Sequence, residues 1–426
     1  MADISLSAAQ TAALRAIREW FLSGTAIQQI FRLFGFAGTG KSTIVKHVID
    51  ELGLDDGEVL QACFTGKASY VLKRKSGISC STIHRLIYRV SEASEAEIAA
   101  TRQKLEEFET AALALYGAER VAADAEIAAL RMGLKEMRQP RFGLNKGSPV
   151  WDCKLIVLDE VSMVGPDMAA DLLSFGKPIL VLGDPGQLPA IKGAGAFTGQ
   201  EPDVMLTEIH RQAAESAVTR LATMAREGIA IPYGPHDELV CKMSSRNVTA
   251  AQLLNGGQVI CGLNKTRFAL NNAMRKAAGF NGSALPTGPG EKIICLKNDH
   301  ALGLLNGMFL ELDGIESADE KRFRAVVTTE EGEVVGGKEP PKLPIYAGHF
   351  LDHEMLDPKR DDRDWRVKKR LVEATYGWAI TCHKAQGSQW ENVIVIDDKW
   401  GRTRDQRAQW LYTAITRAES GLVILD

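Results

Sequence analysis

Six short apolar runs punctuate the chain. They are FRLFGF (31–36), EVLQACF (58–64), KLIVLDE (154–160), PILVLGD (178–184), NVIVID (392–397) and GLVILD (421–426). Their apolar residues run continuously instead of alternating, which is typical of strands buried on both faces of a parallel sheet. Helical segments separate many of these runs. The pattern therefore predicts an α/β fold built on parallel sheets.

Two long segments depart from this pattern. Residues 91–138 are rich in Ala, Glu and Leu and contain no Pro, which predicts two charged amphipathic helices inserted between core strands. Residues 286–345 combine Pro and Gly clusters with the short runs EKIICLK, MFLELDGI and FRAVVTT, which predict a small β-barrel or sandwich. Residues 351–370 are highly charged and predict a helix or loop.

The composition is that of a soluble globular protein. At roughly 100–200 residues per domain, 426 residues predict two to four domains. No apolar run approaches the roughly 20 residues that span a bilayer, and the N-terminus has no signal pattern, so a cytoplasmic protein is expected. The seven cysteines are scattered without a CxxC pair, which favours buried thiols over disulfides or zinc. The net charge of −3 lends no support to nucleic-acid binding, so any DNA contact requires a local basic groove.

Residues 35–42, GFAGTGKS, match the phosphate-binding loop G-x-x-x-x-G-K-[ST]. The match lies after an apolar run and before the helical segment STIVKHVIDEL, where backbone N–H groups and a helix N-terminus can surround phosphate oxygens. Lys41 should reach the β- and γ-phosphates, and Ser42 should ligate Mg²⁺. The predicted nucleotide contacts of the loop are Gly35, Gly38, Thr39, Gly40, Lys41, Ser42 and Thr43.

Two further strand ends carry candidate catalytic groups. In LDEVSMV (158–164), Asp159 would hold Mg²⁺ and Glu160 would orient or deprotonate the attacking water; the alternative is a solvated acidic turn. In ILVLGDPGQLPAI (179–191), a tight turn would place Gln187 at the carboxyl end of the sheet, where ligands bind in such folds. An amide there can contact the γ-phosphate, whereas the plain alternative is a connecting turn.

Two arginines complete the candidate catalytic set. Arg211 lies in LTEIHRQ and Arg417 in LYTAITRAES. An arginine supplied from across a cleft stabilises the negative charge that develops on a departing γ-phosphate. Single arginines are more often surface residues, so these two candidates depend on the motifs around them.

The ordered set GFAGTGKST, STIH, LDEVSM, GDPGQLP, HRQ, TCHKAQG and YTAITRA resembles superfamily-one helicases of the 5′-to-3′ branch, RecD-like and phage Dda-like. The resemblance runs from Gln10 to Arg417. It implies an ATP-dependent DNA helicase that uses Mg²⁺, translocates 5′-to-3′ on single-stranded DNA and unwinds duplex. The implied partners are single-stranded DNA and its junctions with duplex, a single-stranded-DNA-binding protein, and replication or recombination proteins. The working form would be a monomer.

The resemblance also implies roles for individual residues. Gln10 would read adenine, and Gly387 in the fifth motif would contact the nucleotide. The implied DNA contacts are Phe64, Thr65, Lys67, Thr82, His84, Trp378, Thr381 and His383. Hydroxyls can bind DNA phosphates and aromatic rings can stack on bases, although any single aromatic is more often a core residue. Gln389 departs from the family, which often carries Glu there for a ribose contact.

The resemblance divides the chain into two RecA-like motor domains, at 1–90 with 139–200 and at 201–285 with 375–426. Residues 286–374 would form an SH3-like β insert. The helical insert 91–138 is unlike the short β-hairpin of many relatives, and we weigh a wedge at the DNA fork against a solvated helical hairpin. The side chains that could touch a fork are Lys135, Arg138, Arg141, Phe142 and Lys146.

Two other functions stay open from the sequence. One is a single-stranded DNA translocase that displaces proteins with little unwinding, and the other is a non-catalytic DNA-binding subunit of a larger complex. Intact Lys41, Asp159, Glu160 and Arg417 argue against the second.

Overall fold

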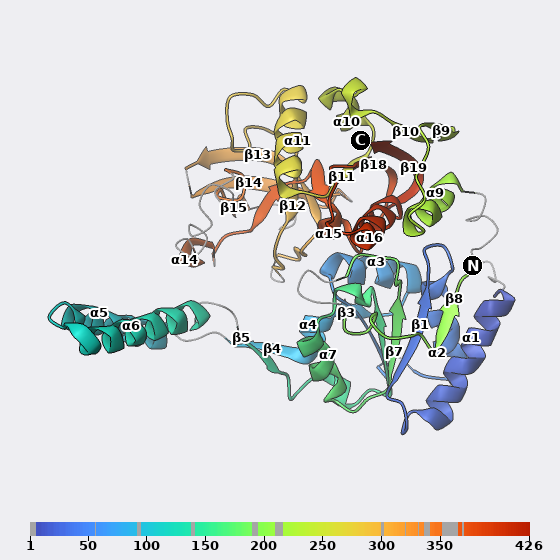
Figure 1. Ribbon diagram of the computed structural model, residues 1–426, viewed down its shortest axis with the longest axis horizontal. Helices are drawn as coiled ribbons and strands as arrows, with labels where there is room; N and C mark the ends of the chain where they lie inside the picture. The colour runs from blue at the N-terminus through green and yellow to red at the C-terminus, as the bar shows by residue number, and fades with distance from the viewer. Residues whose placement is uncertain are drawn as a thin grey trace.

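A computed structural model describes most of the chain. The described residues are 6–55, 57–91, 95–137, 141–189, 195–208, 216–299, 302–319, 321–330, 332–335, 341–351, 365–368 and 370–426. Figure 1 shows two α/β units, a β module beside the second unit, and a helical arm that projects from the first. Among the described residues, no helix is long and apolar enough to cross a membrane.

The first unit is a six-stranded parallel sheet. Its strand order is β3-β2-β6-β7-β1-β8. The strands are β1 (Ile30–Gly35), β2 (Val59–Cys63), β3 (Cys80–Thr82), β6 (Leu155–Asp159), β7 (Ile179–Gly183) and β8 (Val204–Leu206). The helices are α1 (Ala8–Glu19), α2 (Lys41–Leu52), α3 (Gly66–Ser76), α4 (Ile83–Ile87) and α7 (Pro166–Leu173), with a π turn at Trp20–Gly24 and 3₁₀ turns at Pro149–Trp151 and Val161–Met163.

Both faces of this sheet are covered, which explains its continuous apolar runs. Along β6, Leu155 and Val157 join one buried cluster, whereas Ile156 and Leu158 join the cluster on the opposite face. Successive side chains of a strand point to opposite faces, so a strand between two helical layers must be apolar at every position.

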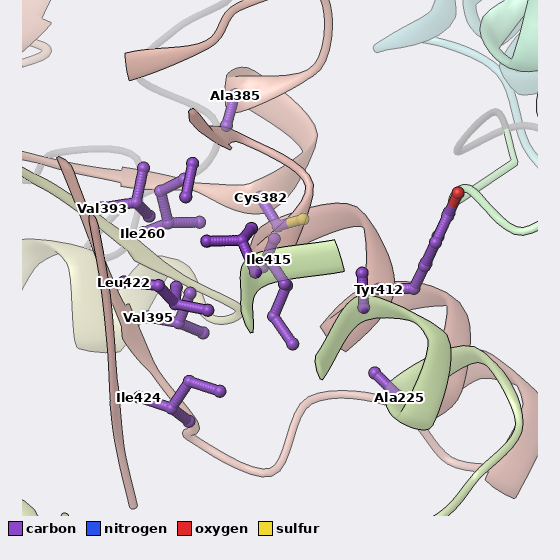
Figure 2. Close-up of a cluster of buried hydrophobic side chains, with 14 of the residues drawn as sticks. Ala225, Ile260, Cys382, Ala385, Val393, Val395, Tyr412, Ile415, Leu422 and Ile424 are labelled. Atoms are coloured by element: carbon purple, nitrogen blue, oxygen red, sulfur yellow. The ribbon is translucent and has the colours of Figure 1, made fainter. Parts of the chain in front are cut away.

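The second unit contains another six-stranded sheet, in the order β17-β11-β18-β19-β10-β9, with only the edge strand β9 antiparallel. Its strands are β9 (Gly234–Asp237), β10 (Val240–Met243), β11 (Gln258–Cys261), β17 (Ala379–Thr381), β18 (Trp390–Ile396) and β19 (Ala418–Leu425). The helices are α9 (Ala217–Arg226), α10 (Ala250–Asn255), α11 (Asn264–Ala277), α15 (Cys382–Ala385) and α16 (Arg404–Ile415), with a 3₁₀ turn at Ser245–Asn247. Figure 2 shows apolar side chains of β11, β18 and β19 packing against α9, α15 and α16.

The β module is a five-stranded antiparallel sheet in the order β15-β14-β13-β12-β16. Its strands are β12 (Glu291–Cys295), β13 (Phe309–Ala318), β14 (Arg322–Thr329), β15 (Leu343–Tyr346) and β16 (Ala374–Tyr376). A short helix, α14 (Trp365–Lys368), falls in the charged segment, of which residues 352–364 lie outside the described chain.

The arm is partly as predicted. Helices α5 (Glu95–Ala112) and α6 (Gly117–Met137) pack against each other, which confirms the helical insert. The sequence did not predict its stem, in which β4 (Tyr88–Ser91) pairs antiparallel with β5 (Arg141–Leu144). At the stem, the Tyr88 hydroxyl donates to Asp171 of α7 at 2.5 Å, which ties the arm to the first unit.

The α/β fold and all six predicted strands are confirmed, but two expected boundaries are wrong. β8 belongs to the first sheet, so that unit extends past residue 200. β16 pairs with β12, so the β module extends past residue 374. In both cases a short strand joins a sheet by long-range pairing, which a local pattern does not reveal.

Candidate functional site

The phosphate-binding loop connects β1 to α2. Gly38 and Gly40 have φ of 81° and 75°, in the left-handed region that glycine enters without strain. The Lys41 ammonium lies across the loop, where it donates to the carbonyl oxygens of Gly35 at 2.6 Å and Phe36 at 3.1 Å. The ammonium is therefore positioned over the hollow that the loop encloses.

A cavity of about 340 Å³ opens beside this loop, between the two α/β units. The predicted residues that line it are Gly38, Gly40, Lys41, Thr43, Asp159, Glu160, Gln187, Gly387 and Arg417. The structure thus brings together motifs that are up to 379 residues apart in the chain, counted from Gly38 to Arg417. Arg211 and the side chain of Ser42 lie outside the described residues.

The acidic pair lies at the carboxyl end of β6. Asp159 Oδ1 accepts from the Glu160 N–H at 2.8 Å, and Glu160 has φ of 53°, a left-handed conformation that is strained for a residue other than glycine. Burial raises the pKa of Glu160, and neighbouring Asp159 raises it further, while Arg417 and Lys41 oppose the shift. A carboxylate with a raised pKa in a cavity is suited to accept a proton.

Arg417 reaches the cavity from the second unit. Its side chain is only 4% exposed. The guanidinium donates to the carbonyl oxygens of Thr413 at 3.1 Å and Ser388 at 3.3 Å, and to the Thr416 hydroxyl at 3.2 Å. These bonds hold the cation at the wall that faces Glu160, where it can stabilise negative charge on a phosphate.

Tyr412 joins the two units, although the sequence did not single it out. Its hydroxyl donates to Asp184 Oδ2 at 2.7 Å and accepts from the Ala37 N–H of the phosphate-binding loop at 2.8 Å. A Cβ atom on Gly186 would lie 2.9 Å from the Tyr412 ring, so glycine is required for this approach. Tyr412 is the first residue of the YTAITRA motif, and its place in this motif could have marked it as a site residue.

Gln10 lies next to the phosphate-binding loop, at the start of α1. Its side-chain amide donates to the Thr39 carbonyl at 3.2 Å and accepts from the Ser7 N–H at 2.9 Å in a capping box at the start of α1. The side chain is buried and does not line the cavity. It supports the phosphate-binding loop, and the adenine contact stays a prediction.

A larger groove of about 840 Å³ runs between both units and the β module. Of the predicted DNA contacts, the groove is lined by Phe64, Thr65, Lys67, Thr381 and His383. The other three do not line it. Thr82 caps α4 by accepting from the Arg85 N–H, His84 packs edge-on behind Phe64 with 5.6 Å between ring centroids, and Trp378 stacks on Tyr376.

Lys67 links the first unit to the β module. Its ammonium lies 3.2 Å from Glu330 Oε2 and 4.6 Å from the centroid of the Phe309 ring. The cation is therefore shared between the groove and the module. A DNA phosphate in the groove would compete with Glu330 for it.

Several groove residues were not predicted from the sequence, among them Asn264, Arg267, Lys384 and Trp400. The Trp400 ring lies 5.2 Å from His383, and a Cβ atom on Gly262 would come within 2.3 Å of Trp400 Cβ, so glycine is required beside it. Asn264 and Arg267 begin α11 directly after β11. Ligands bind at the carboxyl ends of parallel strands, so the place of these residues after β11 could have marked them as binding residues.

The residues present suit a magnesium nucleotide. Magnesium is usually held by one or two carboxylates together with phosphate oxygens and water, and Asp159 supplies a carboxylate beside the loop. Among the described residues, no group of three or more His, Cys, Asp or Glu side chains is placed to hold a metal ion. A metal here would therefore depend on the nucleotide for its other ligands.

Comparison with known proteins agrees with this arrangement. Residues 5–233 match the model of the AAA domain, and residues 376–425 match the UvrD-like helicase C-terminal domain. The chain is 25% identical over 412 residues to a Deinococcus radiodurans protein named ATP-dependent RecD2 DNA helicase, covering 91% of this chain and 45% of that protein. The chain thus spans less than half the length of this relative.

Solved structures of Pif1 helicases share the fold. Two coordinating Pif1 helicases at forked duplex DNA match with a TM-score of 0.55 at 16% identity, covering 99% of this chain and 92% of that one. Bacteroides Pif1 bound to single-stranded DNA matches with a TM-score of 0.52 at 17% identity and the same coverages. These structures show the shared fold, and the two domain matches and the Deinococcus relative agree with the resemblance to superfamily-one helicases.

Proposed function

We propose that this chain, which belongs to the AAA-domain family, is an ATP-dependent DNA helicase that moves 5′-to-3′ on single-stranded DNA and unwinds duplex. One observation carries the proposal. Lys41, Asp159 and Glu160 of the first unit and Arg417 of the second line one cavity, and a groove that contacts both units lies beside it. Closure of the cavity around a nucleotide would therefore change the shape of the groove.

The residues divide the chemistry among them. The ammonium of Lys41 binds the β- and γ-phosphates, and the carboxylate of Glu160 accepts the proton of the attacking water. Arg417 stabilises the charge that develops on the γ-phosphate. Magnesium, held by Asp159 and Ser42 with the phosphates, would neutralise phosphate charge. Gln187 contacts the γ-phosphate, and Arg211 is proposed to assist Arg417.

Motion on DNA follows from the two-unit arrangement. ATP binding draws the units together through Arg417, and hydrolysis releases them. Phe64 and Thr65 hold DNA on the first unit, while Thr381 and His383 hold it on the second, so alternating grip gives directed steps. The 5′-to-3′ direction rests on the resemblance to the RecD-like branch. The name of the Deinococcus relative supports the activity.

The proposal includes the setting of the reaction. The DNA partners are single strands and their junctions with duplex, and the working form is a monomer in the cytoplasm of a bacterium or a phage-infected cell. A single-stranded-DNA-binding protein and other replication or recombination proteins are the proposed protein partners.

Two assays test the function. ATP hydrolysis is measured with and without an oligothymidylate, and unwinding is measured on duplexes with a 5′ or a 3′ single-stranded tail. We expect DNA to stimulate hydrolysis, and only the 5′-tailed duplex to be unwound. Lys41→Ala serves as the inactive control. Hydrolysis that does not respond to DNA would contradict the motor assignment, and unwinding from the 3′ tail alone would contradict the direction. DNA-stimulated hydrolysis without unwinding of either duplex would favour a translocase that displaces proteins.

A further inference from the structure

The 3₁₀ turn Val161–Met163 lies between the nucleotide cavity and the groove. Ser162 lines the cavity and Met163 lines the groove, although the two residues are adjacent in the chain. Val161 between Glu160 and Ser162 is fully buried and anchors the turn in the core. One short element thus touches both candidate sites.

The Ser162 hydroxyl is an unpartnered polar group in a buried place. The residue is 4% exposed, and its hydroxyl makes no hydrogen bond to any residue that the structure describes. The same holds for the side-chain oxygen of Gln187, which is 8% exposed and lines the same cavity. A buried polar group without a partner is destabilising, so such a group in a native protein calls for a reason such as a catalytic role or a bound water. Here both border the cavity that contains Glu160.

The turn is constrained on both sides. It begins at Glu160, whose backbone is in the strained left-handed region with φ of 53°. Behind it, the Ala196 N–H donates to the Val164 carbonyl at 2.8 Å, and a Cβ atom on Gly195 would lie 2.9 Å from the Ser162 carbonyl oxygen. With so little free space, a displacement of Met163 must be passed on to Ser162 and Glu160.

A second loop repeats this arrangement. Gln187 lines the cavity, whereas the following residues Leu188 and Pro189 line the groove. This loop is also held in place, because the Leu188 N–H donates to the Thr413 hydroxyl of the second unit at 2.8 Å. Both unpartnered oxygens therefore belong to residues whose next neighbour in the chain borders the groove.

We propose that the turn Val161–Met163 couples DNA binding to ATP hydrolysis. On the cavity side, the Ser162 hydroxyl positions the attacking water together with Gln187 and Glu160. On the groove side, Met163 contacts the bound DNA strand, and this contact sets the position of Ser162. The inference rests on the proposed helicase function and adds a positioning residue and a sensor to it.

The test measures kcat and KM for ATP, with and without saturating oligothymidylate, in Ser162→Ala and Met163→Ala. Loss of one hydrogen bond to the water should lower the DNA-stimulated kcat of Ser162→Ala about tenfold, with a much smaller loss in the absence of DNA and with KM unchanged. Ser162→Thr keeps the hydroxyl and should recover most of the rate. Met163→Ala should lose most of the DNA stimulation even when DNA is saturating, and Met163→Leu should retain it.

The outcomes separate this inference from the proposed function. Parental kcat in a folded Ser162→Ala would overturn the water-positioning role, as would an equal loss in Ser162→Thr and Ser162→Ala. If saturating DNA stimulates ATP hydrolysis by Met163→Ala as it does in the parent protein, the sensor role is overturned, because the defect would then lie in DNA affinity alone. If DNA fails to stimulate the parental protein, the helicase function itself has failed. Thermal unfolding and ATP-binding measurements confirm that each variant is folded.

Discussion

The buried ion pair between Arg275 of α11 and Glu291 of β12 offers a quantitative test of how the β module is attached. The side chains are 4% and 0% exposed, and Arg275 Nε lies 2.6 Å from Glu291 Oε2. The guanidinium also donates to the carbonyl oxygens of Ser283 and Leu285, both at 3.0 Å. Glu291→Gln retains the shape and an accepting oxygen but leaves the guanidinium charge without its counter-charge.

An uncompensated buried charge sets the size of the effect. Removing one member of a buried pair costs about 3–5 kcal/mol, whereas replacing both members by apolar residues is often close to neutral. We therefore expect Glu291→Gln to lower the free energy of unfolding by about 3–5 kcal/mol. The double variant Arg275→Met/Glu291→Leu should lose less than the single variant. Because α11 begins with Asn264 and Arg267, the single variant should also weaken binding in the groove.

Urea unfolding followed by circular dichroism and tryptophan fluorescence measures the effect. The matched control is Glu316→Gln in the same module, since Glu316 pairs with Lys342 at 2.9 Å but both side chains are about half exposed. Such an exposed pair contributes little, so the control should unfold like the parent protein. If Glu291→Gln is as stable as that control, or if the double variant is less stable than Glu291→Gln, the reasoning from the uncompensated charge is refuted.

Four further predictions concern the cavity, the groove and the helical arm. Lys41→Ala should abolish ATP turnover with an unchanged thermal unfolding midpoint, because the ammonium donates to loop carbonyl groups and is not part of the apolar core; turnover by the folded variant would contradict the phosphate-binding role. Burial raises the pKa of Glu160, so hydrolysis should fall on acidification at a higher pH than an ordinary glutamate would give, and this limb should be absent from the residual rate of Glu160→Gln. DNA affinity should decrease linearly with the logarithm of salt concentration, with a modest slope for a chain of net charge −3; no salt dependence would indicate that base stacking dominates. Replacing 95–137 with a Gly-Ser linker should spare DNA-stimulated hydrolysis and abolish unwinding if the arm is a wedge, and unwinding at the parental rate would exclude that role.

The wedge itself stays a prediction. The structure confirms the helical arm and adds a β stem that was not predicted, but the side chains of Lys135, Arg138, Arg141 and Phe142 lie outside the described residues. The net charge of the described arm residues 95–137 is −4, from nine acidic and five basic residues. That charge disfavours a grip on DNA along the helices.

Local pattern alone determined the six long apolar strands and the nucleotide-binding loop. Continuous apolar runs identify β6 and β7 because both faces of the sheet are covered, and the loop is identified by glycines that adopt left-handed conformations. Asp159 and Gln187 could be assigned for the same reason, since each follows a recognisable strand and parallel strands bring their carboxyl ends to one edge.

Only the tertiary structure decided which distant residues meet. Lys67, whose DNA contact stays a prediction, pairs with Glu330 of the β module, and Tyr412 joins the phosphate-binding loop to Asp184. The Trp400 position depends on a glycine 138 residues earlier, Gly262. The tertiary structure likewise decides that the Val161–Met163 turn borders a cavity at Ser162 and a groove at Met163. Such contacts depend on how whole sheets pack, and no periodicity within a short window records that packing.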